Sequence, residues 1–174
     1  MKKKIHRVCD KLPWNSHFTG ERRCICHGFN LDIGCGPFCQ AGFLGMDIRP
    51  LPEVAFIHDI ESRPWPFPDN SVDRLLASHI LEHIEPKHTI PTWDELWRVM
   101  KKTGQMLVSV PHGMSYGMFQ DPTHNSFYVD MTFAYFCPED PSNLYSIYQP
   151  KPWRMVKMNS YQFGNIEAVM IPLK

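Results

Sequence analysis

The stretch that decides the fold is Leu31-Asp32-Ile33-Gly34-Cys35-Gly36-Pro37, where a short apolar run ends in two glycines. The apolar residues from Phe29 to Ile33 predict a buried β-strand, and the glycines predict a sharp turn directly after it. Glycine lets the backbone turn tightly and approach a ligand closely, which exposes amide N–H groups that can hold a carboxylate or a phosphate. We therefore expect a ligand to bind just after this strand.

Strand and helix signals alternate along the rest of the chain. Further strands are predicted at residues 42–48, 54–58, 72–78, 106–110 and 165–172. Apolar residues at three- and four-residue spacing predict a helix over 89–102, with lysines in its last turn and a stop at Gly104. This alternation predicts an α/β fold, namely a Rossmann-like, doubly wound, mostly parallel sheet with an antiparallel C-terminal strand.

The composition is that of one packed domain. The chain has 174 residues, of which 43% are hydrophobic, which is enough for one sizeable core but short for two. We divide it into an N-terminal extension, residues 1–28, and one domain, residues 29–174. Its 18 basic residues balance 18 acidic ones, so it lacks the positive field that drives unspecific nucleic-acid binding. A nucleic-acid partner is therefore disfavoured.

The sequence also bears on location. The lysines after Met1 are followed by polar residues such as His6 and Asp10, where an export signal needs an apolar stretch. No run of about 18 apolar residues is present to span a bilayer. We expect a soluble, cytoplasmic protein with no membrane partner.

The 6 cysteines allow either a disulfide framework or reduced thiols. A chain of this length needs no disulfides and carries no export signal, which favours thiols. Cys24-Ile25-Cys26-His27, together with Cys9 or Cys39, could bind a structural zinc, although the spacing of its cysteines is tighter than usual. Partly buried thiols are the favoured alternative, and we assign no metal.

Acidic residues follow the next two predicted strands. Asp47 ends the second strand and Asp59 follows the third, where each is positioned to accept hydrogen bonds from hydroxyl groups of a ribose. A dinucleotide site would require a third glycine where Cys39 stands, and an acid about 20 residues further on. The spacing therefore favours a single nucleoside over a dinucleotide.

Five segments in order resemble the motif series of class I S-adenosylmethionine-dependent methyltransferases of type 11. They are Leu31–Pro37, Gly45–Ile48, His58–Glu61, Pro66–Asp73 and Ser78–Ile84. The segment Asp121-Pro122-Thr123-His124 is similar to one found in a branch of phage and bacterial proteins. The resemblance implies S-adenosylmethionine as the cofactor and methyl transfer as the activity.

The resemblance also implies a role for each matching position. The turn at Gly34 to Gly36 would receive the methionine part, Asp47 the ribose, and Asp59 the adenine amino group. Ser78 and His79 would lie beneath the transferring methyl, although His79 and His83 could instead cap or pack the short helix that follows, which is the favoured reading for His83. The full predicted cofactor-binding set is Asp32, Gly34, Cys35, Gly36, Asp47, Ile48, Asp59, Ile60 and Ser78.

The chain departs from the family pattern near its first glycines. Only residues 37–42 separate Gly36 from the second strand, which is too few for the usual long first helix. One face of the sheet is therefore expected to be thinly covered. Residues 1–28, with Trp14 and Phe18, could fold over this gap or over the cofactor.

The segment 112–150 is long, aromatic and follows the fifth strand, so we expect it to form the acceptor side of the site. Tyr116 and Asp121 are the predicted acceptor contacts, and Asp130 is expected to cap a short helix through Phe136. His112 or His124, oriented by Asp121, could remove a proton from the acceptor. With His79, these are the predicted catalytic residues, although Asp121 and His124 could instead only tie the loop down.

The expected reaction is methyl transfer to an oxygen or nitrogen of a small or saccharide-like acceptor. Two alternatives stay open, namely methylation of a protein or nucleic acid, and a non-catalytic module that only binds S-adenosylmethionine. The sequence leaves undecided the acceptor, the need for a general base and the oligomeric state.

Overall fold

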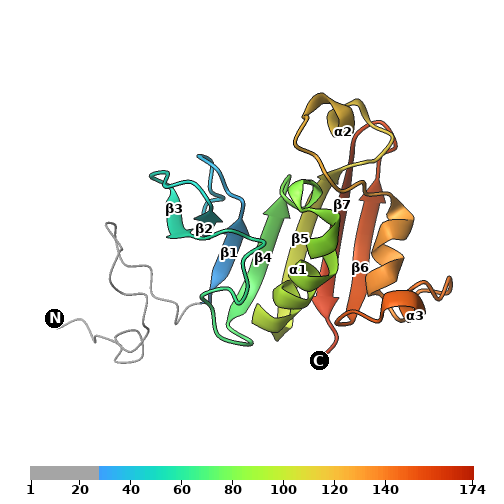
Figure 1. The fold of residues 1–174 in the computed structure, drawn as a ribbon. Helices are drawn as coiled ribbons and strands as arrows, with labels where there is room; N and C mark the ends of the chain where they lie inside the picture. Colours follow the sequence, from blue (N-terminus) through green and yellow to red (C-terminus); the bar gives the residue numbers. More distant parts are fainter. Residues whose placement is uncertain (1–27) are drawn as a thin grey trace.

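The computed structural model describes residues 28–174, which form a seven-stranded sheet in the order β3-β2-β1-β4-β5-β7-β6 (Figure 1). Strands β1 to β5 run parallel, β7 is antiparallel to β5, and β6 is antiparallel to β7. The strands are β1 (Asn30–Ile33), β2 (Leu44–Asp47), β3 (Val54–Ile57), β4 (Val72–Ser78), β5 (Met100–Pro111), β6 (Trp153–Ser160) and β7 (Asn165–Pro172). The predicted fold class, mostly parallel with an antiparallel C-terminal strand, is confirmed.

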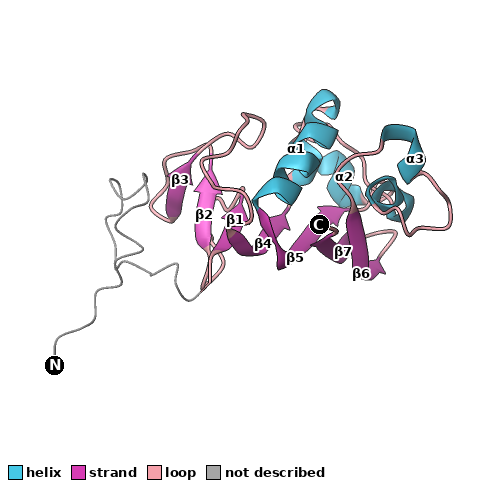
Figure 2. Cartoon of the chain, turned by 90° about the horizontal axis from the view of Figure 1, so that it is seen from below, coloured by secondary structure: helices cyan, strands magenta, loops and turns pink. Residues whose placement is uncertain are grey.

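The helices of the described chain lie on one side of this sheet (Figure 2). Three are α-helical, α1 (Pro86–Val99), α2 (Tyr116–Gln120) and α3 (Tyr145–Tyr148), and η3 (Leu81–His83) and η4 (Asp130–Phe136) are 3-10 helices. Residues 34–43 form turns between β1 and β2, so the long first helix is missing as expected. Within residues 28–174, no helix is both long and apolar enough to cross a membrane.

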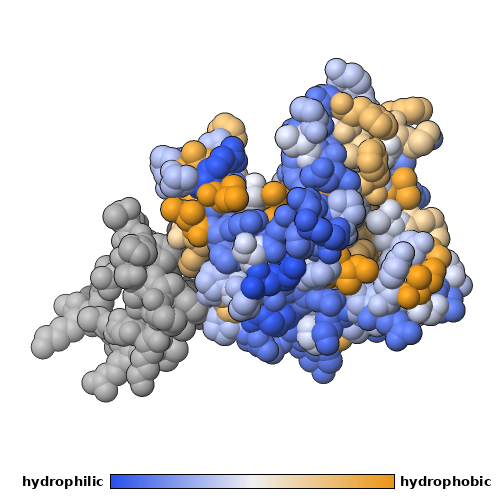
Figure 3. Space-filling view, viewed as in Figure 1, coloured by the Kyte–Doolittle hydropathy of each residue, from blue (hydrophilic) through white to orange (hydrophobic). Residues whose placement is uncertain are grey.

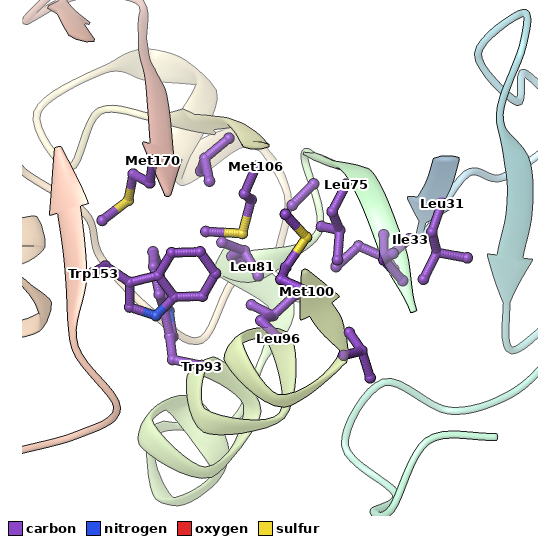
Figure 4. Close-up of a cluster of buried hydrophobic side chains, with 14 of the residues drawn as sticks. Leu31, Ile33, Leu75, Leu81, Trp93, Leu96, Met100, Met106, Trp153 and Met170 are labelled. Carbon is purple, nitrogen blue, oxygen red and sulfur yellow. The ribbon is translucent and has the colours of Figure 1, made fainter. Parts of the chain in front are cut away.

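The core fills the space between the sheet and α1 (Figure 4). Strand residues such as Leu75 and Met106 meet Trp93 and Leu96 of α1, and all four side chains are fully buried. The Trp93 ring stacks on Phe136 with the ring centroids 4.0 Å apart. Burial of one large apolar side chain contributes about 1.5–3 kcal/mol to folding. This layer therefore fixes η4 and α1 against the strands whose ends carry the site.

The predicted end of the main helix was wrong. α1 ends at Val99, and Met100 begins β5, although a helix to residue 102 with a stop at Gly104 was expected. Met100 is fully buried and pairs with Val72, and the Lys101 ammonium lies 2.7 Å from a carboxylate oxygen of Asp73. These pairings with β4 outweigh the local helix-stop signals of the lysines and the glycine.

Two further details differ from the sequence prediction. Strand β6 was missed because it is an edge strand in which only Trp153 is buried, so it lacks a clear alternating pattern. The predicted helix ending at Phe136 is present as η4, but its N-cap is Val129, whose N–H donates to the Thr132 hydroxyl (3.0 Å). Asp130 is therefore not the cap.

A partly buried ion pair between Glu95 and Arg98 holds the proline-rich loop before β4 against α1. The Glu95 carboxylate accepts two hydrogen bonds from the Arg98 guanidinium (2.8 and 2.6 Å) and one from the Trp65 N–H (2.6 Å). Arg98 also binds Asp69 at 2.6 Å. Burial raises the pKa of Glu95, but these bonds outweigh it and hold the pKa below its usual value.

Candidate functional site

The residues expected to form the site gather at one edge of the sheet. Because β1, β2, β4 and β5 are parallel, their carboxyl ends share this edge. It carries the glycine turn after β1, Asp47 at the end of β2, Ser78 and His79 at the end of β4, and His112 after β5. Figure 3 shows a notch there, between the part built on β2 and β3 and the part above β4. Ligands of open α/β sheets bind at such an edge.

The glycine turn is required by its surroundings. Gly34 and Gly36 have positive φ angles of 63° and 54°. A Cβ at Gly34 would lie 2.5 Å from a side-chain carbon of Ile80. The amides of this turn are already used, because Gly34 N donates to the Met46 carbonyl (2.7 Å) and Gly36 N to Asp47 (2.9 Å). The glycines therefore permit close approach, whereas the expectation that these two amides hold the ligand is wrong.

Asp47, at the end of β2, is buried and accepts several hydrogen bonds. Besides Gly36, its carboxylate accepts bonds from the Arg49 backbone (2.9 Å) and from the Arg49 guanidinium (3.0 and 3.1 Å). The guanidinium bonds are the main reason that the pKa of Asp47 is lowered. The Arg49 side chain is 59% exposed, so it can leave and let ribose hydroxyls take its place, while the two backbone bonds hold the carboxylate.

The surroundings of Asp47 suit an adenine ring. Ile48 follows the end of β2, and Ile57 is the last residue of β3. Each side chain is 64% exposed, which provides apolar surface that an aromatic ring can cover. Asp59 accepts bonds from Glu61 N (2.9 Å) and Ser62 Oγ (3.2 Å), so it shapes the loop after β3. Ile60 N donates no hydrogen bond to the part of the chain that the structure describes. The residues present therefore fit a nucleoside with a methionine tail.

Asp32 and Cys35, two of the predicted cofactor residues, make contacts within the protein. Asp32 is buried beneath the turn, where it accepts a bond from Gln40 N (2.8 Å), and burial raises its pKa. Burial also raises the pKa of the Cys35 thiol to about 12, with nearby Cys39 adding to the effect, so the thiol is protonated at neutral pH. Cys35, Cys39 and Cys137 form no disulfide. The segment Cys24 to His27 lies outside the described residues.

Ser78 and His79 end β4 at the centre of the edge. His79 has a positive φ of 53°, its Nδ1 lies 3.2 Å from Oε1 of Glu82, and its Nε2 lies 3.1 Å from the side-chain nitrogen of Asn165. The contact with Glu82 is the main cause that raises the pKa of His79. The ring is half exposed and fixed between η3 and β7, at the place where the resemblance puts the transferring methyl.

The other two predicted catalytic histidines are held by backbone groups. His112 is buried, its Nδ1 accepts a bond from Met114 N (3.0 Å), and its Nε2 faces Asp130 at 3.6 Å. Nδ1 of His112 is thus already used as an acceptor, which argues against its acting as a base. His124 Nδ1 lies 2.8 Å from the Met118 carbonyl, which can only accept, so Nδ1 carries the proton. His124 retains an Nε2 lone pair, and its role as a base stays a prediction.

Asp121 does not orient His124, so that expectation is wrong. Its carboxylate accepts bonds from the backbone N–H and the hydroxyl of Thr123 (2.9 and 2.7 Å). Nδ1 of His83 in turn lies 3.0 Å from the Thr123 hydroxyl. His83 therefore contacts the loop at Thr123, whereas capping or packing of the short helix was the favoured expectation, and Asp121 acts on it through Thr123. Tyr116 begins α2 and is 80% exposed, which leaves it free to contact an acceptor.

Sequence reasoning missed Glu82, which is completely buried beside His79 and His124. The signal in the sequence was an acidic residue between two apolar residues, Leu81 and Ile84, which are themselves buried.

A separate hollow of about 500 Å³ lies by the amino-terminal ends of β1 and β4, away from this edge. It is lined by Gly28, Asn30, Asp73, Arg74, Thr103 and Gln105.

Comparisons with known proteins found a matching family model and solved structures with a similar fold. Residues 31–108 match the family model described as "Methyltransferase domain". A solved S-adenosylmethionine-dependent methyltransferase from Archaeoglobus fulgidus is similar, with 17% identity and a TM-score of 0.60 over 83% of this chain and 86% of that one. None of the curated protein sequences matches the chain.

Two further solved structures share the fold. One is a 1,6-didemethyltoxoflavin-N1-methyltransferase from Burkholderia thailandensis with bound S-adenosylhomocysteine, with 12% identity and a TM-score of 0.57 over 86% of this chain and 75% of that one. The other is a putative methyltransferase in complex with the Haloferax volcanii Trm112 activator, with 13% identity and a TM-score of 0.58 over 83% and 82% of the two chains.

Residues 31–108, from β1 into β5, therefore resemble a methyltransferase domain, and the described chain has the fold of class I S-adenosylmethionine-dependent methyltransferases.

Proposed function

We propose that this enzyme transfers a methyl group to an oxygen or nitrogen of a small or saccharide-like acceptor. The observation that carries the proposal is an exposed apolar surface on the segment after β5, which Figure 3 shows at the top of the molecule. Its side chains are Met114, Tyr116, Phe119 and Phe127, each more than half exposed. Aromatic surface of this kind suits a small ring, whether a planar ring or a sugar.

This surface is fixed beside the site by backbone hydrogen bonds. The N–H groups of Asn125 and Ser126 both donate to the Glu82 carbonyl (2.8 and 2.9 Å), and the Asn125 side chain donates to the His83 carbonyl (2.9 Å). Since η3 directly follows the end of β4, these bonds hold the segment next to His79. Its position supports a role as a wall of the acceptor site.

S-adenosylmethionine supplies the activated methyl, so the chain mainly has to bind, orient and exclude water. Asp47 would hold the ribose, Ile48 would cover the adenine, and the aromatic segment would align the acceptor and keep water away. His124 retains an Nε2 lone pair that can accept an acceptor proton.

Methylation of a protein or nucleic acid is the second candidate. The balanced charge of the chain offers a nucleic acid no general attraction. A protein partner stays a candidate because one structural neighbour was solved in complex with an activator protein. A non-catalytic binding module is the third candidate, and the oligomeric state is open.

The proposal predicts selective binding of one nucleoside class. S-adenosylmethionine and its demethylated product should bind with roughly micromolar affinity, and nicotinamide dinucleotides should not bind, because no third glycine follows the turn. Isothermal titration calorimetry with both ligand classes measures this directly. Tight dinucleotide binding without S-adenosylmethionine binding would contradict the assignment, and formation of demethylated cofactor across a panel of small hydroxyl and amine acceptors then tests the acceptor class.

Tyr116→Ala is expected to separate acceptor binding from cofactor binding. The side chain is 80% exposed on α2, so its loss should leave the fold and the S-adenosylmethionine affinity unchanged. Turnover of an identified acceptor should fall by roughly tenfold, the loss of one aromatic contact of about 1 kcal/mol or more. Tyr148→Ala, at an exposed tyrosine of α3 away from this edge of the sheet, is the matched control (Figure 1). Equal turnover in the parent and both variants would remove this segment from the acceptor site.

A further inference from the structure

Glu82 lacks the partners that a buried carboxylate requires. Its side chain is completely buried, and neither carboxylate oxygen accepts a hydrogen bond from a described residue. The nearest basic atoms are His79 Nδ1 at 3.2 Å, without hydrogen-bond geometry, and His124 Nε2 at 4.0 Å. A buried carboxylate that accepts no hydrogen bond is costly even beside a histidine, so a group that binds it directly is expected here.

The two neighbouring histidines are held in the tautomer that binds metals. His124 donates its Nδ1 proton to the Met118 carbonyl, so the lone pair on Nε2 faces Glu82. The Thr123 hydroxyl donates to Asp121 and must therefore accept from His83 Nδ1, which leaves the lone pair of His83 on Nε2. A hydrogen bond from the second ring nitrogen is the usual support of a metal-binding histidine.

The three side chains are close enough to share one ion. One ligand atom each from Glu82, His83 and His124 lies within 4.8 Å of the others, and the two imidazole rings are 4.7 Å apart between centroids. In a tetrahedral site with metal–ligand distances of about 2.0–2.1 Å, the ligand atoms lie roughly 3.3 Å from one another, so these side chains need to approach by up to ~1.5 Å.

We propose that Glu82, His83 and His124 form a divalent-metal site, with Zn²⁺ as the ion that fits best. Two imidazole nitrogens and one carboxylate oxygen suit Zn²⁺, whereas Mg²⁺ and Ca²⁺ favour oxygen ligands. Three protein ligands leave one coordination position open. The site adjoins His79, so an acceptor hydroxyl or amine is the ligand for this position. That use rests on the proposed function, whereas metal binding itself does not.

The proposal assigns a role to the segment from Asp121 to His124. His124 binds the metal through its Nε2 lone pair, which then cannot serve as the base, while Asp121 and Thr123 are positioning residues that orient His83. A hydrogen bond from the Asn125 side chain to the His83 carbonyl, across 42 positions of the sequence, already holds this segment beside η3.

Calorimetry with Zn²⁺ alone tests the site. The full-length chain should carry Cys24→Ser and Cys26→Ser, so that the cysteines near the N-terminus do not contribute, and should be freed of metal first. We expect one Zn²⁺ to bind per chain. Glu82→Gln and His124→Gln should lower the Zn²⁺ affinity by roughly 100-fold or more. Loss of a residue that only hydrogen-bonds to a metal ligand already lowers the affinity by about 10–100-fold. Thr123→Val should weaken binding by about 10–100-fold, and Thr123→Ser should restore it. His88→Gln, which changes a histidine of α1 outside the cluster, should bind as the parent does.

Folding and cofactor binding are measured on the same samples. Circular dichroism checks that each variant is folded, and if Glu82→Gln is not, the partly exposed His83→Gln takes its place. Co²⁺ in place of Zn²⁺ should give visible absorption without a thiolate band. No Zn²⁺ binding in the serine background, or equal binding in the ligand variants, would overturn the site. S-adenosylmethionine titration of these samples tests the proposed function separately, since it does not depend on Zn²⁺ uptake.

Discussion

Glu95→Ala is expected to lower the free energy of unfolding by about 2–3 kcal/mol, because it removes a charged acceptor from a partly buried ion pair, while Arg98 keeps its contact with Asp69. The Arg98 guanidinium would lose two of its bonds, and the Trp65 N–H would lose its acceptor. Urea unfolding followed by circular dichroism measures the change. Glu95→Gln is the control that keeps the acceptor for Trp65, and it should cost less than the alanine variant.

The same ion pair has a defined pH dependence. Since the folded pKa of Glu95 is lowered, its contribution is complete above the unfolded pKa of ~4.3 and is lost as the pH falls through the folded value. The stability difference between the parent and Glu95→Gln should therefore shrink below about pH 4. A difference that is independent of pH from 3 to about 7 would mean that packing, and not charge, accounts for the loss.

Asp47→Ala is expected to weaken S-adenosylmethionine binding by about 2–3 kcal/mol, or roughly 30–150-fold, because a charged acceptor makes the stronger class of hydrogen bond with ribose hydroxyls. Calorimetry measures this. Arg49→Ala is the matched control, since it removes the present partner of Asp47 but keeps the carboxylate, and it should cost less than about tenfold.

An Asp47→Ala variant that binds the cofactor as tightly as the parent would reassign Asp47 to a structural role. The carboxylate ties the glycine turn to the end of β2 through Gly36 N. Such a role would appear as a lower melting temperature of the variant without a change in affinity.

Much of the fold was predictable because its signals are local. β4 at Val72–Ser78 and β7 at Asn165–Pro172 have the predicted bounds, since each is a buried apolar strand. The edge strand β6 and the end of α1 were not predictable in this way. β6 has little buried surface, and the Met100 pairing depends on β4, a segment more than twenty residues earlier in the chain.

The position of the predicted cofactor residues follows from local sequence. The glycine turn and Asp47 follow consecutive parallel strands, and parallel strands place their carboxyl ends at one edge whatever the remaining contacts are. Which atoms of the predicted site residues are free depends instead on tertiary contacts. The tertiary structure pairs Asp47 with Arg49, uses Nδ1 of His112 for a backbone bond, and brings His124 to the buried Glu82. These contacts depend on how distant segments of the chain pack together and on how deeply each side chain is buried. A local pattern of residues encodes neither property.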